Sequence, residues 1–442
     1  MQKIVYMSLV ILCAIYTGSS EAYEIKKNLV VGVDISDDSA IFTNPQFIQK
    51  ASKYIRSKVE KLPTISKVHA VTFGACAGYL ESRGYDVKRV APLDPQSPYR
   101  FNPLHRARTY EELMSLGQTL IKVPDGNNRV FSLAAINTLA CFSRALHSFS
   151  PEHAGLDEIL HLARRAQFSE KEVTDLILQV DDQAVQDSWL SIVKDASKGG
   201  VLNGSMSELQ LALTLFNDPV ICQNTTNDNL GEFPTLRKKK TAIFLELNEK
   251  SAETHGMTYL APFFSQVFDS LLSDKNSELG LNVKLYLDEA AHFLPHISSA
   301  AMAYATLRRR NVSIMTCLQS LAQAEDIPKY QTILDNCWVK NFLNINNPKS
   351  LSQISQLMGL TEKEEGGRII QRELMSAAEI AKMKNGSAIC LINGLNPIFI
   401  DGLNGFFDDE TLSKRAHLPV YSNNSSQIVT MSPRLLSPKM ET

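Results

Sequence analysis

The sequence predicts an α/β protein in which a mostly parallel sheet is covered by helices and a long helical region is inserted. Apolar runs typical of buried strands alternate with helical patterns, the order that builds parallel sheets. This alternation stops at about residue 109 and returns at Ala242. The length of 442 residues allows two or three domains.

The composition is that of an ordinary globular protein, with 44% hydrophobic and 21% charged residues. It excludes a mainly disordered chain and one with many membrane-spanning helices. The net charge of −2 excludes a histone-like coat and an acidic solvating chain, but not a local basic groove. None of the seven cysteines forms a C-x-x-C pair, which excludes a zinc ribbon and a thioredoxin-like motif.

Residues 1–22 have the pattern of a bacterial secretory signal peptide. Lys3 is a short basic start, the run Ile4–Tyr16 is almost wholly apolar, and Ser20-Glu21-Ala22 is a small-x-small cleavage site. A spanning helix needs roughly 20 apolar residues, so we expect cleavage after Ala22. An uncleaved N-terminal anchor is the alternative.

Residues 23–74 are predicted to form a small strand–helix–strand unit of uncertain origin. The strands are expected at Asn28–Ile35 and Val68–Phe73, and apolar residues at helical spacing predict a helix from Pro45 to about Leu62.

The turn after the first of these strands carries Asp34, Ser36 and Asp38. Their spacing resembles part of the D-x-S-x-S metal-adhesion motif of von Willebrand factor A domains. The third position is Asp instead of Ser, and the other ligands of such a domain have no counterpart downstream. A loop of polar turn residues is the alternative.

Residues 75–108 are predicted to begin the main domain, and residues 109–235 to form its all-helical insert. A strand is expected at Tyr85–Val90, followed by the turn Pro92–Pro95 and by Phe101–Leu104. Turn residues then divide the helical region at Asp125-Gly126, Ser150-Pro151 and Gly199-Gly200.

Residues 236–405 resume the α/β pattern, and 406–442 are predicted to be a tail with a disordered end. The Asn393-Gly394 pair is a strong signal for a hairpin. Strands are expected at Ala242–Leu247, Val283–Leu287, Val312–Met315, Trp338–Leu343, Ala388–Ile392 and Pro397–Ile400.

An acidic pair, Asp288-Glu289, ends one of these strands. Ligands of α/β proteins bind at the carboxyl ends of parallel strands. In nucleotide hydrolases an Asp at this place orders Mg²⁺ through its water shell, and a Glu polarises the attacking water. Gln319 follows the next expected strand, where it can contact a terminal phosphate or its water. The alternative is a strand end with solvated acids.

Two groups of basic residues are candidates for phosphate contacts. Arg308 lies eleven residues before Gln319, and an arginine at a subunit edge can reach a neighbour's phosphate. A solvated helix end is the alternative for Arg308–Arg310. The other group can contact DNA phosphates and consists of Arg237, Lys238, Lys239 and Lys240.

Two other kinds of site are excluded. His292 and His296 are four residues apart, but the Glu of H-E-x-x-H is missing and Pro295 breaks the helix that would align them. No G-x-S-x-G elbow marks a serine hydrolase.

Several segments together resemble the conjugative coupling proteins of type IV secretion, the TraG/TraD-like family. The likeness covers roughly residues 75–405 in the family's order. The segments are GYLESRGYDVKRVAPLDPQSPYRFNPL, LYLDEAAHFLP, LRRRNVSIMTCLQSLAQAED, ILDNCWVKNFLNINNPKSLSQISQLMGLTE and QRELMSAAEIAKMKNGSAICLINGLNPI. The last resembles the region that closes the family's motor domain, and residues 236–405 as a whole resemble its C-terminal motor region, which includes the TraM-recognition segment.

The resemblance implies a RecA-like motor with an inserted all-α domain, assembled as a homo-hexamer at the inner membrane. It implies ATP and Mg²⁺ as cofactors, and DNA, a relaxosome protein and the secretion channel as partners. Carried over by motif, Asp288 and Glu289 become the Walker B pair, with Asp288 holding Mg²⁺ through water. By the same resemblance, Gln319 corresponds to the sensor residue of the family's third motif, and Arg308 is a candidate arginine finger.

One family motif is missing. The phosphate loop G-x-x-x-x-G-K-[ST] should precede residue 75, but the chain contains no Gly-Lys dipeptide, so nucleotide-binding residues stay unassigned. We therefore expect an N-terminally truncated or fused coupling-protein homologue with impaired ATP hydrolysis. The alternatives are a docking module inactive toward ATP and an exported von Willebrand factor A-like binding protein. A cleaved signal would export a motor module that should face the cytoplasm.

Overall fold

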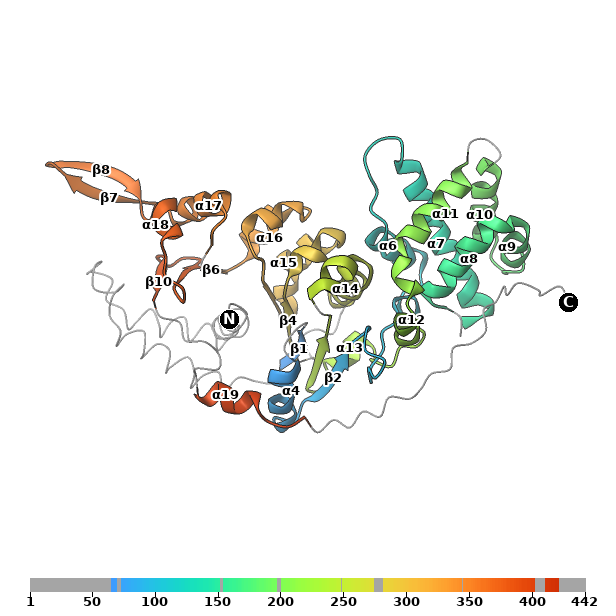
Figure 1. Cartoon of the computed structure of the whole chain (residues 1–442), viewed down its shortest axis with the longest axis horizontal. Helices are drawn as coiled ribbons and strands as arrows, with labels where there is room; N and C mark the ends of the chain where they lie inside the picture. The colour runs from blue at the N-terminus through green and yellow to red at the C-terminus, as the bar shows by residue number, and fades with distance from the viewer. Residues whose placement is uncertain are drawn as a thin grey trace.

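The computed structural model describes residues 65–69, 73–151, 154–196, 200–247, 249–273, 281–343, 345–401 and 410–420. A five-stranded sheet forms its centre, with a helical lobe on one side and a smaller sheet on the other (Figure 1). The strand order is β2-β3-β1-β4-β5, and every pairing is parallel. The strands are β1 (Ile65–His69), β2 (Asp86–Val90), β3 (Thr241–Leu245), β4 (Asn282–Leu287) and β5 (Val312–Thr316).

Several predictions lie outside the described residues. They are the signal segment 1–22, the strand Asn28–Ile35, the helix Pro45–Leu62, the trio Asp34, Ser36 and Asp38, and the end of the tail beyond residue 420.

Strand β3 shows how the sheet is covered, because all five of its residues are buried. On one face, Ala242 and Phe244 pack in a cluster with Ala77 and Leu80 of α4 (Phe73–Ser82). On the other face, Ile243 and Leu245 belong to the main core, which includes the phenylalanines of α14 (Glu249–Ser273). A strand buried on both faces reads as a continuous apolar run, and the predicted α/β class with a parallel sheet is confirmed.

The place of β1 differs from the expectation. The sequence suggested a strand at Val68–Phe73 in a separate small unit, whereas the structure has β1 at Ile65–His69 in the middle of the main sheet. Its Val68 is in register with Ile243 of β3 and Leu285 of β4. Phe73 begins helix α4 instead of ending a strand. Short apolar runs do not by themselves distinguish a strand end from a helix start.

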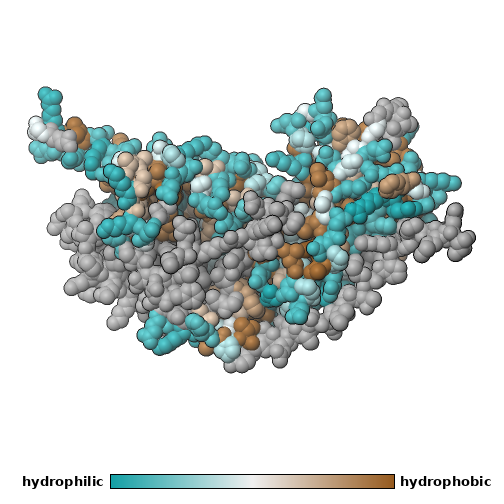
Figure 2. Space-filling view, viewed as in Figure 1, coloured by the Kyte–Doolittle hydropathy of each residue, from teal (hydrophilic) through white to brown (hydrophobic). Residues whose placement is uncertain are grey.

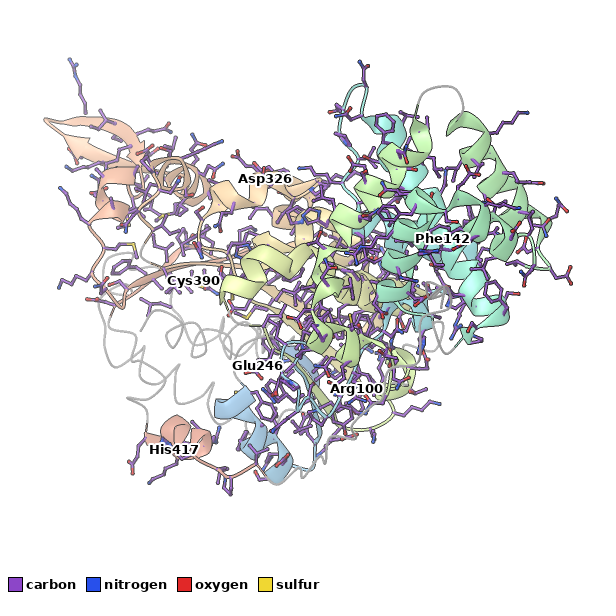
Figure 3. The ribbon with its side chains drawn as sticks, turned by 45° about the vertical axis from the view of Figure 1, so that its right-hand side comes forward. Arg100, Phe142, Glu246, Asp326, Cys390 and His417 are labelled. Atoms are coloured by element: carbon purple, nitrogen blue, oxygen red, sulfur yellow. The ribbon has the colours of Figure 1, made fainter. Side chains whose placement is uncertain are left out.

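The helical lobe contains no strand among its described residues between Pro103 and Leu236. Its core includes Phe142 and Trp189, whose ring centroids are 5.3 Å apart, and Figure 3 shows Phe142 among the helices. The helices are α5 (Pro103–Arg106), α6 (Tyr110–Leu120), α7 (Arg129–Phe149), α8 (Leu156–Phe168), α9 (Glu170–Ile177), α10 (Gln183–Ala196), α11 (Val201–Ala212), α12 (Pro219–Thr225) and α13 (Phe233–Leu236), with a 3₁₀ turn at Thr214–Asn217.

Helix α7 is the only helix in the described part of the chain that is long and apolar enough to cross a membrane. It is also the central helix of the lobe, where Ile136, Leu139 and Phe142 are fully buried. The burial of these side chains inside the lobe accounts for its apolar character.

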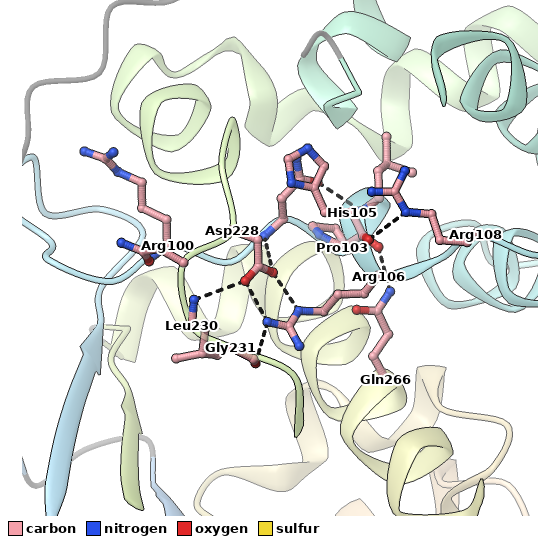
Figure 4. Close-up of polar contacts among 12 residues, drawn as sticks. Arg100, Pro103, His105, Arg106, Arg108, Asp228, Leu230, Gly231 and Gln266 are labelled. Carbon is pink, nitrogen blue, oxygen red and sulfur yellow. Dashed lines mark hydrogen bonds and ion pairs between the residues drawn. The ribbon is translucent and has the colours of Figure 1, made fainter. Parts of the chain in front are cut away.

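The lobe joins the sheet through a buried polar junction (Figure 4). The Asn102 side-chain amide donates to the carbonyl oxygens of Ala154 at 2.8 Å and Thr226 at 3.2 Å. Arg106 and Asp228 form a two-bond ion pair with both distances at 2.6 Å, and both side chains are under a tenth exposed. The FNPL segment, Phe101–Leu104, therefore contributes Asn102 to this junction.

A second, three-stranded antiparallel sheet follows the main one, in the order β10-β9-β6. The predicted hairpin forms between β9 and β10, and Gly394 in its loop has a φ of +83°. This part comprises β6 (Val339–Leu343), β9 (Ala388–Ile392), β10 (Ile398–Ile400), α15 (Ala300–Thr306) and α16 (Tyr330–Asn336) leading into it, α17 (Pro348–Met358) and α18 (Ala377–Ala381).

The predicted tail contains a helix that packs on the main domain. Helix α19 (Glu410–Ala416) lies against α4, and the Arg415 guanidinium is 4.7 Å from the Tyr79 ring centroid. The backbone after it approaches α4 so closely that a Cβ on Gly78 would lie 2.2 Å from the Leu418 carbonyl oxygen.

Candidate functional site

The candidate site lies where β4 and β5 end side by side. Leu287 and Thr316, the last residues of the two strands, are in register. The contact continues past the strands, because the Cys317 amide donates to the Leu287 carbonyl at 2.8 Å and the Ala290 amide to the Cys317 carbonyl at 3.2 Å. These bonds fix the two segments that carry the acidic pair and Gln319.

The structure brings Glu289 and Gln319 together across this edge. The Gln319 side-chain amide donates to Glu289 Oε2 at 3.0 Å. Asp288, on the same turn, accepts a hydrogen bond from the Glu289 amide at 3.1 Å. Residues 30 positions apart in the sequence thus form one polar cluster, in which Gln319 orients one oxygen of the Glu289 carboxylate.

Glu289 also has an uncommon backbone conformation, with φ 50° and ψ 40°. It is one of three non-glycine residues with positive φ among the described residues. A left-handed conformation costs a residue with a side chain about 1–3 kcal/mol, and such strain clusters at functional sites. The conformation points to a role for Glu289 beyond packing.

Sequence reasoning did not identify the polar residues that support this pair. Gln323 accepts a hydrogen bond from the Gln319 amide at 3.0 Å and donates one to Ser320, which caps the 3₁₀ turn Leu321–Asp326. His292, rejected above as a zinc ligand, lies 4.0 Å from Glu289 Oε2. The S-x-x-Q spacing was a detectable signal for the cap.

Tyr304 contacts the end of β5, where its hydroxyl is hydrogen-bonded to the Thr316 hydroxyl. Burial raises the pKa of Tyr304 far above its usual value. A neutral, partly buried phenol therefore anchors the strand that leads to Gln319.

Arg308 lies at the amino ends of the parallel strands, whereas this cluster lies at their carboxyl ends. It belongs to the 3₁₀ turn Leu307–Arg310, which precedes β5, and its guanidinium carbon is 5.0 Å from the Trp338 ring centroid. The five residues of β5 span about 16 Å between the two edges. Arg308 therefore does not join Glu289 and Gln319 within one chain, and a role as a finger requires a neighbouring subunit.

The basic run before β3 divides into a buried and an exposed part. Arg237 is 2% exposed and donates to the carbonyl oxygens of Leu281 at 3.1 Å and Arg310 at 3.0 Å. It ties together the starts of β4 and β5, so we correct its predicted role from a DNA contact to a structural one. Sequence alone did not separate it from its neighbours in the run.

The three lysines of the run are exposed. Lys239 pairs with Asp86 at 2.6 Å, and the Lys240 ammonium donates to the Arg83 carbonyl at 3.3 Å. They lie at the same edge of the sheet as Arg308. The candidate DNA-contacting charges therefore lie at the amino ends of the strands, and the acidic cluster lies at their carboxyl ends.

The donors at the carboxyl edge fit Mg²⁺ but not a triphosphate. Two adjacent carboxylates are oxygen ligands of the kind that Mg²⁺ prefers. A phosphate loop of the G-x-x-x-x-G-K-[ST] type supplies glycine amides and a lysine, and the chain contains no Gly-Lys dipeptide. Within the described residues, no group of three or more His, Cys, Asp or Glu side chains has the geometry of a metal site.

Comparison with known proteins decides the family. The model of type IV secretory system conjugative DNA transfer proteins matches residues 68–429. The chain belongs to this family. The resemblance to coupling proteins of type IV secretion inferred from the sequence is thereby confirmed. A comparison with curated protein sequences found no match.

Solved structures of the bacterial conjugative coupling protein TrwB share the fold of this family member. The unbound form has a TM-score of 0.62 at 16% identity, over 83% of each chain. TrwB with ADP and Mg²⁺ has a TM-score of 0.57 at 16% identity, over 77% of this chain and 84% of TrwB. TrwB with the ATP analogue ADPNP has a TM-score of 0.57 at 15% identity, over 77% and 85%. The expected RecA-like α/β fold is confirmed.

Proposed function

We propose that this chain links relaxosome DNA to the secretion channel during conjugative transfer. Family membership and the fold shared with TrwB support this role. The observation that carries the proposal at the residue level is the hydrogen bond between Gln319 and Glu289 across adjacent strand ends. In this proposal the chain is associated with the inner membrane, assembles as a homo-hexamer and docks a relaxosome protein.

The carboxyl edge is proposed as the acidic half of a nucleotide site. Asp288 would hold Mg²⁺ through its water shell, and Glu289 would orient and deprotonate a water molecule. Gln319 would fix the Glu289 carboxylate and face the terminal phosphate. Mg²⁺, when bound, would neutralise phosphate charge. Arg308, at the opposite edge, would serve a neighbouring subunit.

We infer that the chain alone hydrolyses ATP negligibly. A triphosphate is held by backbone amides and a lysine at a helix start, and the sequence contains no Gly-Lys dipeptide of a phosphate loop to supply them. The chain would then act in DNA and partner docking, with the motor fold serving as a scaffold. This is the second candidate function, and the missing Gly-Lys dipeptide favours it.

A salt series of DNA binding tests the coupling role. Phosphate contacts make the logarithm of the binding constant fall linearly with the logarithm of salt concentration. A Lys238→Ala/Lys239→Ala/Lys240→Ala variant should bind DNA more weakly and lower the magnitude of this slope by about two, since roughly 0.7–0.9 is lost per phosphate contact. Lys171→Ala, an exposed lysine on the helical lobe, is the matched control. No DNA binding by the native chain at low salt would contradict the proposal.

A further inference from the structure

A two-stranded arm projects from the smaller sheet and was not predicted from the sequence. Strands β7 (Leu360–Glu365) and β8 (Arg368–Glu373) pair along their whole length (Figure 1). Gly366 and Gly367 form the turn with φ of +61° and +77°, as a tight two-residue hairpin requires. The arm is rooted at its base, where the Leu374 amide donates to the Gly359 carbonyl at 3.0 Å.

The arm is solvent-exposed along its length. Every residue of β8 is exposed, and the arm stands away from the body at the upper left of Figure 2, mostly hydrophilic with an apolar patch. Leu360 is 65% exposed and Ile369 is 71% exposed. An isolated two-stranded hairpin is marginally stable in water, so an arm of this kind gains stability when one of its faces is covered.

The register gives the two faces of the arm opposite charge. Residues that are directly paired share a face. The pairs Leu360–Glu373, Glu362–Gln371 and Glu364–Ile369 form one face, with three carboxylates. The pairs Thr361–Arg372, Lys363–Ile370 and Glu365–Arg368 form the other, with three basic residues and one acidic residue. We name these the acidic face and the basic face.

Each face also carries apolar side chains between its charges. Leu360 and Ile369 lie on the acidic face and Ile370, 41% exposed, on the basic face. A DNA strand would match only the basic face, and the carboxylates on the other face of the hairpin would oppose its approach. A protein surface with apolar centres and complementary charge matches both faces.

We propose that the arm packs against the arm of a second copy of this chain, acidic face to basic face. Such a contact uses two different surfaces of the same element, so it is heterologous and propagates from copy to copy until a ring closes. The charges select the register, and the apolar side chains between them are buried. The proposal rests on the self-assembly in the proposed function and names one surface that drives it.

Two charge-reversed variants of the full chain test this pairing. In Lys363→Glu/Arg372→Glu both faces of the arm are acidic, and in Glu362→Lys/Glu373→Lys both are basic. Each variant alone should self-associate at least tenfold more weakly than the native chain at low salt, because like charges face each other. An equimolar mixture of the two should recover native association, since acidic and basic arms then alternate. Sedimentation velocity across a concentration series gives these values.

The exposed arm allows these changes without loss of the fold, which circular dichroism and thermal melting check. Lys171→Glu/Asp175→Lys, on the helical lobe, is the matched control for a change of charge. Native-like association of either variant alone, or no recovery on mixing, overturns the arm pairing while leaving assembly through other surfaces intact. A native chain that stays monomeric overturns both. Weaker DNA binding by the all-acidic arm with unchanged self-association would identify a DNA-contacting arm instead, and would also overturn the pairing.

Discussion

The Gln319 side chain donates a 3.0 Å hydrogen bond to the Glu289 carboxylate, although the two residues follow different strands. The bond exists because β4 and β5 are parallel neighbours whose last residues are in register. Glu289 holds this position with a left-handed backbone. The parallel sheet thus brings the residues of two separate sequence motifs together in one cluster.

A carboxylate at position 319 should destabilise this cluster in a pH-dependent way. In Gln319→Glu two carboxylates lie about 3 Å apart, and at pH 7 their repulsion should cost about 1 kcal/mol of unfolding free energy at this partly exposed site. Near pH 4 protonation should remove the cost. Urea midpoints at the two pH values measure the effect, with Gln319→Met as control. Equal losses at both pH values would argue against a direct contact.

The buried Arg106–Asp228 pair should be much more important for stability than a surface pair. Asp228→Ala leaves the Arg106 guanidinium buried without its partner, and such losses cost about 3–5 kcal/mol. Lys414→Ala breaks the exposed pair with Glu410, at 75% and 83% exposed, and should change stability by less than about 0.5 kcal/mol. Equilibrium urea unfolding distinguishes them, and similar effects of both changes would show that the junction is solvated.

Stability should fall as the pH drops from about 6.5 toward 4, partly because of His147. Burial, together with the nearby Arg108 charge, lowers the pKa of His147 to about 4, although its ring nitrogen is 3.0 Å from the Leu104 carbonyl oxygen. Because the folded pKa lies below the unfolded value, the unfolded chain binds the proton first, so stability is full above pH 6.5. His147→Gln should remove a pH-dependent loss on the order of 2 kcal/mol across this window. Parallel pH–stability curves for the two proteins would refute the assignment.

Helix α19 should detach when a methyl group is added to α4. In Gly78→Ala the new Cβ would collide with the Leu418 carbonyl oxygen, 2.2 Å away. Trypsin should then cut faster after Lys414 and Arg415, by an amount that mass spectrometry of timed digests quantifies. Ser82→Ala on the same helix is the control. Unchanged cleavage would mean that the 410–420 segment does not depend on this contact.

Sequence patterns identified the α/β class, the acidic pair, its glutamine partner and the β9–β10 turn, because each depends on local periodicity or on a short motif. They did not place β1 in the main sheet, since which strands are neighbours is decided by long-range packing. Nor did they separate buried Arg237 from exposed Lys238–Lys240. A run of basic residues has the same sequence whether its side chains bind neighbouring strands or face solvent. The β7–β8 arm was missed since charges on both faces hide the alternation typical of a half-buried strand.

The most direct test of the central claim is a Mg²⁺-dependent ATPase assay of the purified full chain alongside DNA binding. The claim is that this coupling-family chain keeps an ordered acidic edge but lacks the means to hold the triphosphate. The native chain should bind DNA and show negligible turnover, unchanged in Glu289→Gln, while a chain carrying a restored phosphate-loop segment should have a higher nucleotide affinity. Robust turnover by the native chain that Glu289→Gln abolishes would contradict the account.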